Sequence, residues 1–361
     1  MYQRANGTWC DTIPQGKGKP HKFFYGKTKA EVKKKIAEWK EKQEKGKTID
    51  EAVAEWEETH YKNVRESTVR TYHASVERIL EAFKGVYVKD LQAAQIQALW
   101  NQLAAQRFAR TTISTTKVVL TMILNHQILS PEGTLKYNPV TATRIPSNAP
   151  KHIRELPDRN CIEIIKKSVG VEFGLFPFLL IYTGCRKNEA LALTDKDFTE
   201  DSISISKSVY WHSDGKPEIT VPKTSAAIRE VFLLPPLANV LPKWEGYLFS
   251  CDGGITPLSS QQFFHLWSQY CLAVGLAHRE YKPTKSKTRK HVQQLVYHVT
   301  PHQLRHEYAT ICYDAGIEAK DAANLLGHTT DVMTRNIYTH ITNTRKEETG
   351  KKLSEYVTKI Y

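Results

Sequence analysis

The chain has 361 residues, a formal net charge of +13 at pH 7 and 40% hydrophobic residues. This length indicates two or three domains with real cores, and the charge favours a polyanionic partner without excluding an ordinary basic protein. The absence of any Cys-x-x-Cys pair is typical of reduced thiols and excludes the usual disulfide and zinc patterns. A polar N-terminus and the lack of a long apolar run predict a cytoplasmic protein that does not enter a membrane.

The first 46 residues predict a small sheet packed on one helix. Asn6-Gly7 is a hairpin signal, and Thr28 to Glu31 has the spacing of a capping box that opens a helix through Trp39. A charged segment, Lys40 to Lys47, follows as an expected hinge. The sheet is a candidate DNA-binding surface, although it could equally be a solvated sheet. The basic residues that suggest DNA binding are Arg4, Lys17, Lys19, Lys22, Lys27 and Lys29.

Residues 47–145 predict a four-helix bundle. Apolar residues recur at helical spacing in four stretches, beginning near Thr48, Ser67, Asp90 and Thr111. Such a bundle is a fold and not a function. Arg70 lies on the polar face of the second predicted helix, where it could contact phosphate or be an ordinary solvated side chain.

Prolines at 146, 150 and 157 exclude a continuous helix and predict a linker over residues 146–156, in which Lys151 could lie along DNA. Residues 157–345 form the largest expected domain. It should begin with two helices, continue with three strands near residues 202–206, 218–221 and 230–233, and be mostly helical after residue 255, apart from a basic run from Lys282 to His291. Residues 346–361 are a charged, amphipathic tail that we expect to dock on another surface. The fold class expected is α+β, mainly α, with a small antiparallel sheet in the largest domain.

Residues suited to phosphodiester chemistry gather in a few short motifs of this domain. Breaking a phosphodiester without a metal requires guanidinium groups for the phosphate oxygens, a nucleophile and a proton donor for the leaving oxygen. Two-metal chemistry would require clustered carboxylates, which these motifs lack, so we expect no metal or cofactor. Taken singly, Arg305 could be a structural arginine, the histidines could be core residues, and Tyr338 is one of 17 tyrosines. His302 and Arg305 lie about one helical turn apart, which would place them on one face of a helix.

These motifs resemble the signature boxes of the tyrosine recombinases, the phage-type integrases and their relatives in conjugative transposons. The resemblance rests on four boxes in the family's order: Thr183-Gly184-Cys185-Arg186-Lys187-Asn188-Glu189, His302-Gln303-Leu304-Arg305-His306, Leu326-Gly327-His328 and Tyr338-Thr339-His340. It covers the whole chain, and implies an arm-type DNA-binding domain over 1–46, a helical core-binding domain over 47–145 and a catalytic domain over 157–345. The match of the first domain rests only on pattern and basic character.

The resemblance also implies a role for each matching residue. Arg186 and Arg305 would bind the scissile phosphate, and Tyr338 would attack it to form a 3′-phosphotyrosyl link and release a 5′-hydroxyl. His302 would assist proton transfer at the nucleophile, and His328 would hydrogen-bond a phosphate oxygen. Lys223 would protonate the leaving oxygen, and Glu189 would support the site. Glu307 stands where many relatives carry a small or hydroxyl residue, and its carboxylate has no assigned part.

The function implied is that of a site-specific DNA recombinase, an integrase of a mobile element, that needs neither metal nor ATP. Its partners would be double-stranded DNA with core and arm-type sites, three further copies in a homotetramer, and an excisionase or a DNA-bending host protein. One alternative is a type IB topoisomerase-like or hairpin-resolving strand transferase, which the three-domain layout disfavours. Another is a non-catalytic DNA-binding relative, which the complete catalytic set disfavours.

Overall fold

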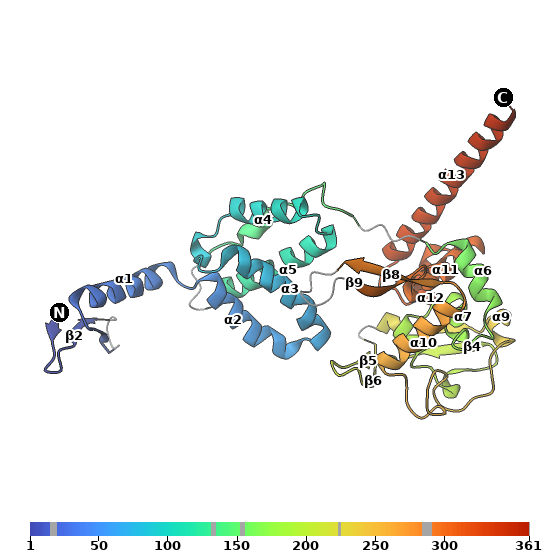
Figure 1. Cartoon of the computed structure of the whole chain (residues 1–361), viewed down its shortest axis with the longest axis horizontal. Coiled ribbons are helices and arrows are strands. Elements are labelled where there is room, and N and C mark those ends of the chain that lie inside the picture. Colours follow the sequence, from blue (N-terminus) through green and yellow to red (C-terminus); the bar gives the residue numbers. More distant parts are fainter. Residues whose placement is uncertain (15–19, 131–134, 152–155, 223–224, 284–290, 361) are drawn as a thin grey trace. The chain divides into compact units, whose positions relative to one another are not determined.

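The computed structural model describes residues 1–14, 20–130, 135–151, 156–222, 225–283 and 291–360. The chain divides into two compact units, Met1–Ile153 and Arg154–Tyr361 (Figure 1). Both units are mainly helical with small antiparallel sheets, so the expected α+β, mainly α, fold class is confirmed. Within the described ranges, no helix is both long enough and apolar enough to cross a membrane.

The first unit begins with the expected sheet and helix. Strands β1 (Tyr2–Gln3), β2 (Trp9–Ile13) and β3 (Lys22–Gly26) pair antiparallel in that order, with Gly7 at φ +80° in the predicted hairpin turn. Thr28 Oγ1 accepts the Glu31 N–H at 3.2 Å, so the predicted cap opens α1 (Lys29–Lys45). The rings of Phe24 and Trp39 pack edge-on with their centroids 5.7 Å apart, and this contact holds the helix on one face of the sheet. The expected hinge at Lys40–Lys47 is wrong for most of its length, because α1 continues through Lys45.

The predicted four-helix bundle is confirmed. Its main helices are α2 (Ile49–His60), α3 (Glu66–Phe83), α4 (Ala93–Ala105) and α5 (Arg110–Leu129). The short helices η1 (Tyr61–Asn63) and η2 (Val88–Asp90) follow α2 and α3, and η3 (Pro139–Ala142) follows α5. Their shared core includes the fully buried Trp100, whose Nε1 donates to Thr143 Oγ1 at 3.0 Å. Ala149 is buried in the same core, and Arg110 N–H donates to the Pro150 carbonyl at 2.8 Å. Residues 146–150, expected to be linker, therefore pack on the bundle.

The second unit is built around a buried helix pair. Helix α7 (Leu175–Thr183) is almost wholly apolar, as expected, and packs against α11 (Pro301–Asp314). The remaining helices are α6 (Arg159–Lys167), α8 (Lys187–Ala190), η4 (Asp195–Asp197), η5 (Ser225–Ala227), α9 (Pro235–Ala238), α10 (Ser260–Ala273), α12 (Ala319–Leu326) and α13 (Val332–Ile360). The core between α7, α10 and α11 carries Phe176, Phe263 and Leu304. This packing fixes α11, which carries the box His302–His306, against the end of α7, where the box Thr183–Glu189 begins.

Four strands of the second unit form two short antiparallel pairs, and three of the four were predicted. Strand β4 (Ser202–Ile205) pairs with β7 (Arg229–Phe232), and β5 (Ser208–Trp211) pairs with β6 (Pro217–Thr220). Of these four strands, only β5 was not predicted.

The stretch after residue 255 is mostly helical, as expected, but the interruption at the basic run is longer than Lys282–His291. Strands β8 (Ala277–Pro283) and β9 (His291–Tyr297) pair antiparallel, with Tyr281 opposite Gln293. Residues 346–360, expected to belong to a tail, continue the helix α13 that carries Tyr338 (Figure 1), and the docking of this segment on another surface stays a prediction. Neither strand nor helix periodicity is strong in the sequence of these segments.

Candidate active site

Arg186 is positioned by a sharp turn between α7 and α8. Gly184 ends α7 at φ +63°, and a Cβ at this position would lie 2.4 Å from the Tyr308 ring, so only glycine fits. The Arg186 N–H donates to Glu189 Oε2 at 2.9 Å, and its Nη1 donates to Oε1 of the same carboxylate at 2.7 Å. The first turn of α8 therefore fixes the backbone and the guanidinium of Arg186 through one acidic side chain.

The C-terminal end of α12 receives three arginine side chains on three consecutive carbonyl groups. Arg229 Nε donates to the Leu325 carbonyl at 2.7 Å, Arg305 Nη2 donates to that of Leu326, and Arg186 Nη2 donates to that of Gly327 at 3.0 Å. The last carbonyls of a helix have no partners within the helix and form its negative end, so cations are stabilised there. The three guanidinium groups are thus gathered at one point in space, although they lie far apart in the sequence.

Glu189 lies against all three of these arginines. Its carboxylate oxygens are 2.7 Å from Arg186 Nη1, 2.9 Å from Arg229 Nη2 and 3.9 Å from Arg305 Nη1. Burial works against the charged form of Glu189, but the charges and hydrogen bonds of Arg229 and Arg186 outweigh it and hold its pKa below the ordinary value. Three cations facing one carboxylate leave an excess of positive charge, which suits a bound anion.

Arg305 shows how strong that excess is. Its side chain is 3% exposed, and its Nη1 also donates to the Gly184 carbonyl at 2.8 Å. Burial, together with the positive charges of Arg186 and Arg229, lowers the pKa of Arg305 to about 9. It remains charged at neutral pH, and a phosphate placed beside it would relieve the repulsion between the guanidinium groups. We define Arg186, Glu189, Arg229 and Arg305 as the arginine cluster.

His328 follows Gly327 directly and lies beside the arginine cluster. Gly327 ends α12 at φ +64°, and the chain turns there to place His328 in a buried position. The imidazole Nδ1 lies 2.9 Å from Oγ1 of Thr334, which is fully buried. Burial and the charges of Arg305 and Arg186 lower the pKa of His328 to about 3, so the ring is neutral at physiological pH. A neutral ring next to several cations can donate one hydrogen bond without adding charge.

His302 and His306 lie one turn apart on α11. His302 is exposed and His306 is buried, and their rings meet edge-on with centroids 4.6 Å apart. His302 therefore lies at the surface beside the cluster and is accessible to a bound strand.

Tyr338 is not brought to the arginine cluster. Its hydroxyl donates to the Ile317 carbonyl at 3.1 Å, and its ring meets Tyr313 edge-on with centroids 5.0 Å apart. Burial raises its pKa to about 12, which disfavours the phenolate. Ile317 precedes α12, whereas the arginines bind the end of this eight-residue helix, which is about 12 Å long. The expected nucleophile is thus docked at the far end of α12.

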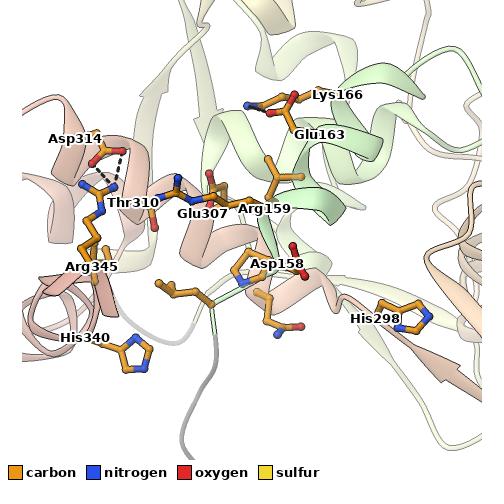
Figure 2. Close-up of a pocket in the computed structure, with 15 residues that line it drawn as sticks. Asp158, Arg159, Glu163, Lys166, His298, Glu307, Thr310, Asp314, His340 and Arg345 are labelled. Atoms are coloured by element: carbon orange, nitrogen blue, oxygen red, sulfur yellow. Dashed lines mark hydrogen bonds and ion pairs between the residues drawn. The ribbon is translucent and has the colours of Figure 1, made fainter. Parts of the chain in front are cut away.

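Further contacts hold α13 against α11 near Tyr338. Tyr313 Oη lies 3.0 Å from Thr342 Oγ1, and Arg345 forms an ion pair with Asp314 at 2.6 Å (Figure 2). The Arg345 guanidinium also lies 5.4 Å from the centre of the Tyr313 ring. Tyr338, Thr342 and Arg345 recur at helical spacing, so one stripe of α13 carries all these contacts.

A hollow of about 920 Å³ opens between α6, α11 and α13 (Figure 2). Its α11 lining includes Glu307, Thr310 and Asp314. Residues advance by roughly 100° along a helix, so these three lie on the face of α11 opposite to Arg305. Burial raises the pKa of Glu307. The carboxylate that was unassigned by the sequence therefore belongs to this hollow and not to the arginine cluster.

Three of the other predicted site residues lie outside the described residues, namely Lys223, Lys17 and Lys19. The candidate DNA-contacting side chains that are described are all exposed: Arg4, Lys22, Lys27, Arg70 and Lys151. Arg4 stacks over the Tyr25 ring at 4.7 Å, and Tyr25 stacks on the exposed Phe23.

The sequence analysis missed Arg229 and Thr334. A signal for Arg229 existed: the predicted strand has Val231 facing inward, and the period of two puts Arg229 on the same buried face. A buried arginine requires a partner, so it could have been matched with Glu189. Thr334 lies in an irregular polar stretch and gave no such signal.

Comparison with known proteins identifies the family. The model of the phage integrase family matches residues 151–345, and that of the phage integrase N-terminal SAM-like domain matches residues 48–104. A XerC-like tyrosine recombinase of Caldanaerobacter subterraneus subsp. tengcongensis is 23% identical over 92% of this chain and 91% of its own length. The ICEBs1 integrase of Bacillus subtilis is 25% identical over 51% of this chain and 49% of its own.

Solved structures show the same fold. The Tn1549 transposon integrase in complex with transposon right end DNA superposes with a TM-score of 0.61 at 18% identity, over 85% of this chain and all of that one. The lambda integrase tetramer bound to a Holliday junction superposes with a TM-score of 0.54 at 18% identity, over 93% of both chains. With one family model matching more than half of its length, the chain belongs to the phage integrase family, the tyrosine recombinases.

Proposed function

We propose that this tyrosine recombinase is the integrase of a mobile element, and that it exchanges DNA strands through a covalent link between Tyr338 and a 3′-phosphate. The observation that carries the proposal is the arginine cluster: Arg186 and Arg305 converge on the end of α12 with more positive charge than Glu189 neutralises. Named relatives support the element-borne role, because they include a transposon integrase and the ICEBs1 integrase.

The scissile phosphate would bind to Arg186 and Arg305. A guanidinium presents parallel donors that match two phosphate oxygens and stays charged while negative charge develops in the transition state. Arg186 is suited to receive DNA because 42% of its side chain remains exposed, whereas the buried Arg305 supplies charge from beneath. His328 would donate a hydrogen bond from Nε2 in the tautomer in which Thr334 donates to Nδ1, which the 2.9 Å contact allows.

Strand cleavage would then proceed by attack of Tyr338 Oη on phosphorus. The O–P bond forms, the bond from phosphorus to the 5′-oxygen breaks, and the leaving oxygen takes a proton from Lys223. His302, exposed beside the cluster, would accept the phenol proton. Attack by the 5′-hydroxyl of a second strand reverses these steps, so the energy of the phosphodiester is kept and neither ATP nor a metal is required.

Reaching the phosphate requires Tyr338 to leave the Ile317 carbonyl. The contacts to be broken include the hydrogen bonds of Tyr338 to Ile317 and of Tyr313 to Thr342, the aromatic contact with Tyr313 and the Asp314–Arg345 pair, and each is worth about 1 kcal/mol. We therefore propose that DNA binding shifts the first turns of α13 toward the cluster. This step would keep a free protein from cleaving DNA at random.

The proposal also includes the domain layout and partners expected from the sequence. Residues 1–46 would bind arm-type sites through the exposed face that carries Arg4 and Tyr25, 47–145 would be the core-binding domain, and 157–345 the catalytic domain. Residues 146–156 would join the last two, with Lys151 near DNA. Four copies would act together on two DNA sites, as the lambda integrase does in its tetramer on a Holliday junction. An excisionase or a bending protein would set the direction.

A nicked suicide substrate tests this function. Cleavage near a nick releases a short fragment, so the covalent protein–DNA product accumulates. We expect an adduct that maps to Tyr338, forms in the presence of EDTA and is missing from Tyr338→Phe. An adduct on another residue, such as Tyr356, or one that needs a divalent metal, would contradict the proposal.

A further inference from the structure

Arg229 differs from the other two arginines of the cluster in having every nitrogen engaged by the protein. Its Nε donates to the Leu325 carbonyl at 2.7 Å, its Nη1 to the Ala227 carbonyl at 3.1 Å, and its Nη2 to Glu189 at 2.9 Å. Its side chain is only 5% exposed. A buried guanidinium whose three nitrogens each donate to a protein acceptor is not placed to grip DNA.

The acceptors of Arg229 belong to three separate segments of the site. Leu325 lies in the last turn of α12, Ala227 in the short helix η5 before β7, and Glu189 in α8. The planar Arg229 guanidinium therefore links three parts of the site. These are Glu189, which holds Arg186, the end of α12, which precedes His328, and the segment just before β7.

Gly327 shows how closely this side chain fits beneath His328. A Cβ on Gly327 would lie 2.9 Å from Arg229 Nη1 and 3.1 Å from its Cδ. The turn that ends α12 thus rests directly on the Arg229 side chain. Because His328 is the next residue, the position of its ring depends on this contact.

Arg229 also helps to hold the Glu189 carboxylate away from Arg305. Oε2 of Glu189 accepts from Arg229 Nη2 and from the Arg186 N–H, each at 2.9 Å, and lies 3.9 Å from Arg305 Nη1. Without Arg229, that oxygen would lose one of its two hydrogen bonds and would be drawn toward Arg305. The carboxylate would then close onto Arg305 and compete with the phosphate for its donors.

We infer that Arg229 is a positioning residue of this recombinase, which holds the Gly327–His328 turn and the Glu189 carboxylate in the arrangement that phosphate binding requires, without touching DNA itself. The inference rests on the proposed function for its kinetic consequence. Its structural consequence, the placement of His328, is independent of any reaction.

The test uses the full chain with Arg229→Met and Arg229→Lys. Lysine keeps the charge but lacks the planar fork, so it cannot reach three acceptors in three segments. We expect both variants to bind duplex DNA within about twofold of the wild type. Single-turnover formation of the covalent adduct should be about 100-fold slower in Arg229→Met than in the wild type. Arg229→Lys should recover less than a tenth of the wild-type rate.

A double variant, Arg229→Met with Glu189→Gln, separates the two roles that Arg229 could have. If Arg229 acts through Glu189, the double variant should be no slower than the slower single variant, because the competing carboxylate is gone. Losses that multiply, or a fall in adduct formation that matches a fall in DNA affinity, would show that Arg229 contacts DNA and overturn the inference.

Titration of His328 by NMR gives a readout that needs no cleavage. In the wild type the ring should stay neutral well below pH 6, and in both Arg229 variants it should titrate closer to its ordinary pKa of 6.5. Lys207→Met removes a comparable ion pair, to Asp197 at 2.8 Å, and should leave the His328 titration unchanged. Gly327→Ala, which displaces Arg229 without changing charge, should shift the titration in the same direction.

These measurements distinguish the two possible failures. A wild type that forms no adduct would contradict the proposed function, while the His328 titration would still decide the role of Arg229. An unchanged His328 titration in folded Arg229→Met and Arg229→Lys would overturn the inference even if the wild type cleaves DNA.

Discussion

The arginine cluster and the helix α13 carry the two halves of the proposed chemistry, and they are built in opposite ways. Arg305 and Arg229 are buried, and each is hydrogen-bonded to carbonyl groups that the fold fixes. Tyr338 sits on a helix held near it by hydrogen bonds of exposed or half-buried side chains, an aromatic contact and a partly exposed ion pair. The phosphate site is therefore assembled before DNA arrives, while the nucleophile is held in reserve.

The difference has a physical reason. Gathering three cations costs energy, so the cluster needs a rigid frame with Glu189 at its centre to exist without phosphate. A phenol in an apolar contact costs nothing to keep, and its pKa of about 12 leaves it unreactive until its surroundings change. Each of the following changes disturbs one side of this comparison.

Removal of the central carboxylate should have the largest effect on the cluster. Glu189→Gln leaves three arginines without a counter-charge, and breaking a buried ion network of this kind costs about 3–5 kcal/mol. Thermal unfolding should therefore show a strongly destabilised second unit, and adduct formation by the fraction that remains folded should be slow but measurable. An unchanged melting temperature would mean that Glu189 does not hold the cluster together.

The neutral His328 should make stability depend on pH. Its folded-state pKa, about 3, lies below its ordinary value of 6.5, so the unfolded chain binds the proton first. Its contribution is complete above pH 6.5 and is lost as the pH falls toward 3, by up to about 1.4 kcal/mol per pH unit. Glu189 should add a further loss below its ordinary pKa of 4.5.

Chemical denaturation at several pH values measures this slope. His328→Asn should flatten it between pH 6.5 and 4.5, whereas His73→Asn, at an exposed histidine of the first unit, should leave it unchanged. Equal slopes in the wild type and in His328→Asn would show that His328 is protonated in the folded protein.

Loosening the contact of α13 with α11 should have a smaller effect, and it should make adduct formation faster instead of slower. Arg345→Met removes the pair with Asp314, which is partly exposed and worth at most about 1 kcal/mol. We expect adduct formation to become about two- to fivefold faster. Arg335→Met removes an ion pair at the start of α13, to Asp331 just before the helix, and should show no acceleration. A slower Arg345→Met would indicate that the docked position assists cleavage.

The smallest effect is expected in the N-terminal sheet. Replacing Arg4, Lys22 and Lys27 by alanine should reduce the slope of log affinity against log salt by at most about 3 on DNA that carries an arm-type site. A matched triple variant at the exposed Lys33, Lys34 and Lys40 of α1, outside the sheet, should change the slope less. Equal slopes in the two triples would place arm binding elsewhere.

The sequence predicted part of the arginine cluster but not the docked position of Tyr338. Arg186 and Arg305 could be paired from their boxes alone, and the structure brings them together on the end of α12. The period of two in the strand marks Arg229 as buried, but only the fold shows that β7 runs beside the end of α12 and makes Arg229 the third arginine there. The docking of Tyr338 was also beyond the sequence, since it depends on which carbonyl lies within reach of its hydroxyl after α11 and α12 have packed.

Elements with strong periodicity were predicted well, and charged ones were not. The apolar stripe of α3 and the buried run of α7 allow only one structure. Strands β8 and β9 and the end of α13 lack such a pattern in the sequence, so neither the strand pair nor the continued helix was predicted.

A structure of the full chain bound to duplex DNA that carries its own recombination site is the most direct test. The account predicts that Arg186, Arg305 and His328 keep the positions described here, while Tyr338 has left the Ile317 carbonyl and lies within about 3.5 Å of the scissile phosphorus. A rearranged arginine cluster, or a Tyr338 still bound to Ile317 in a complex that cleaves, would contradict it.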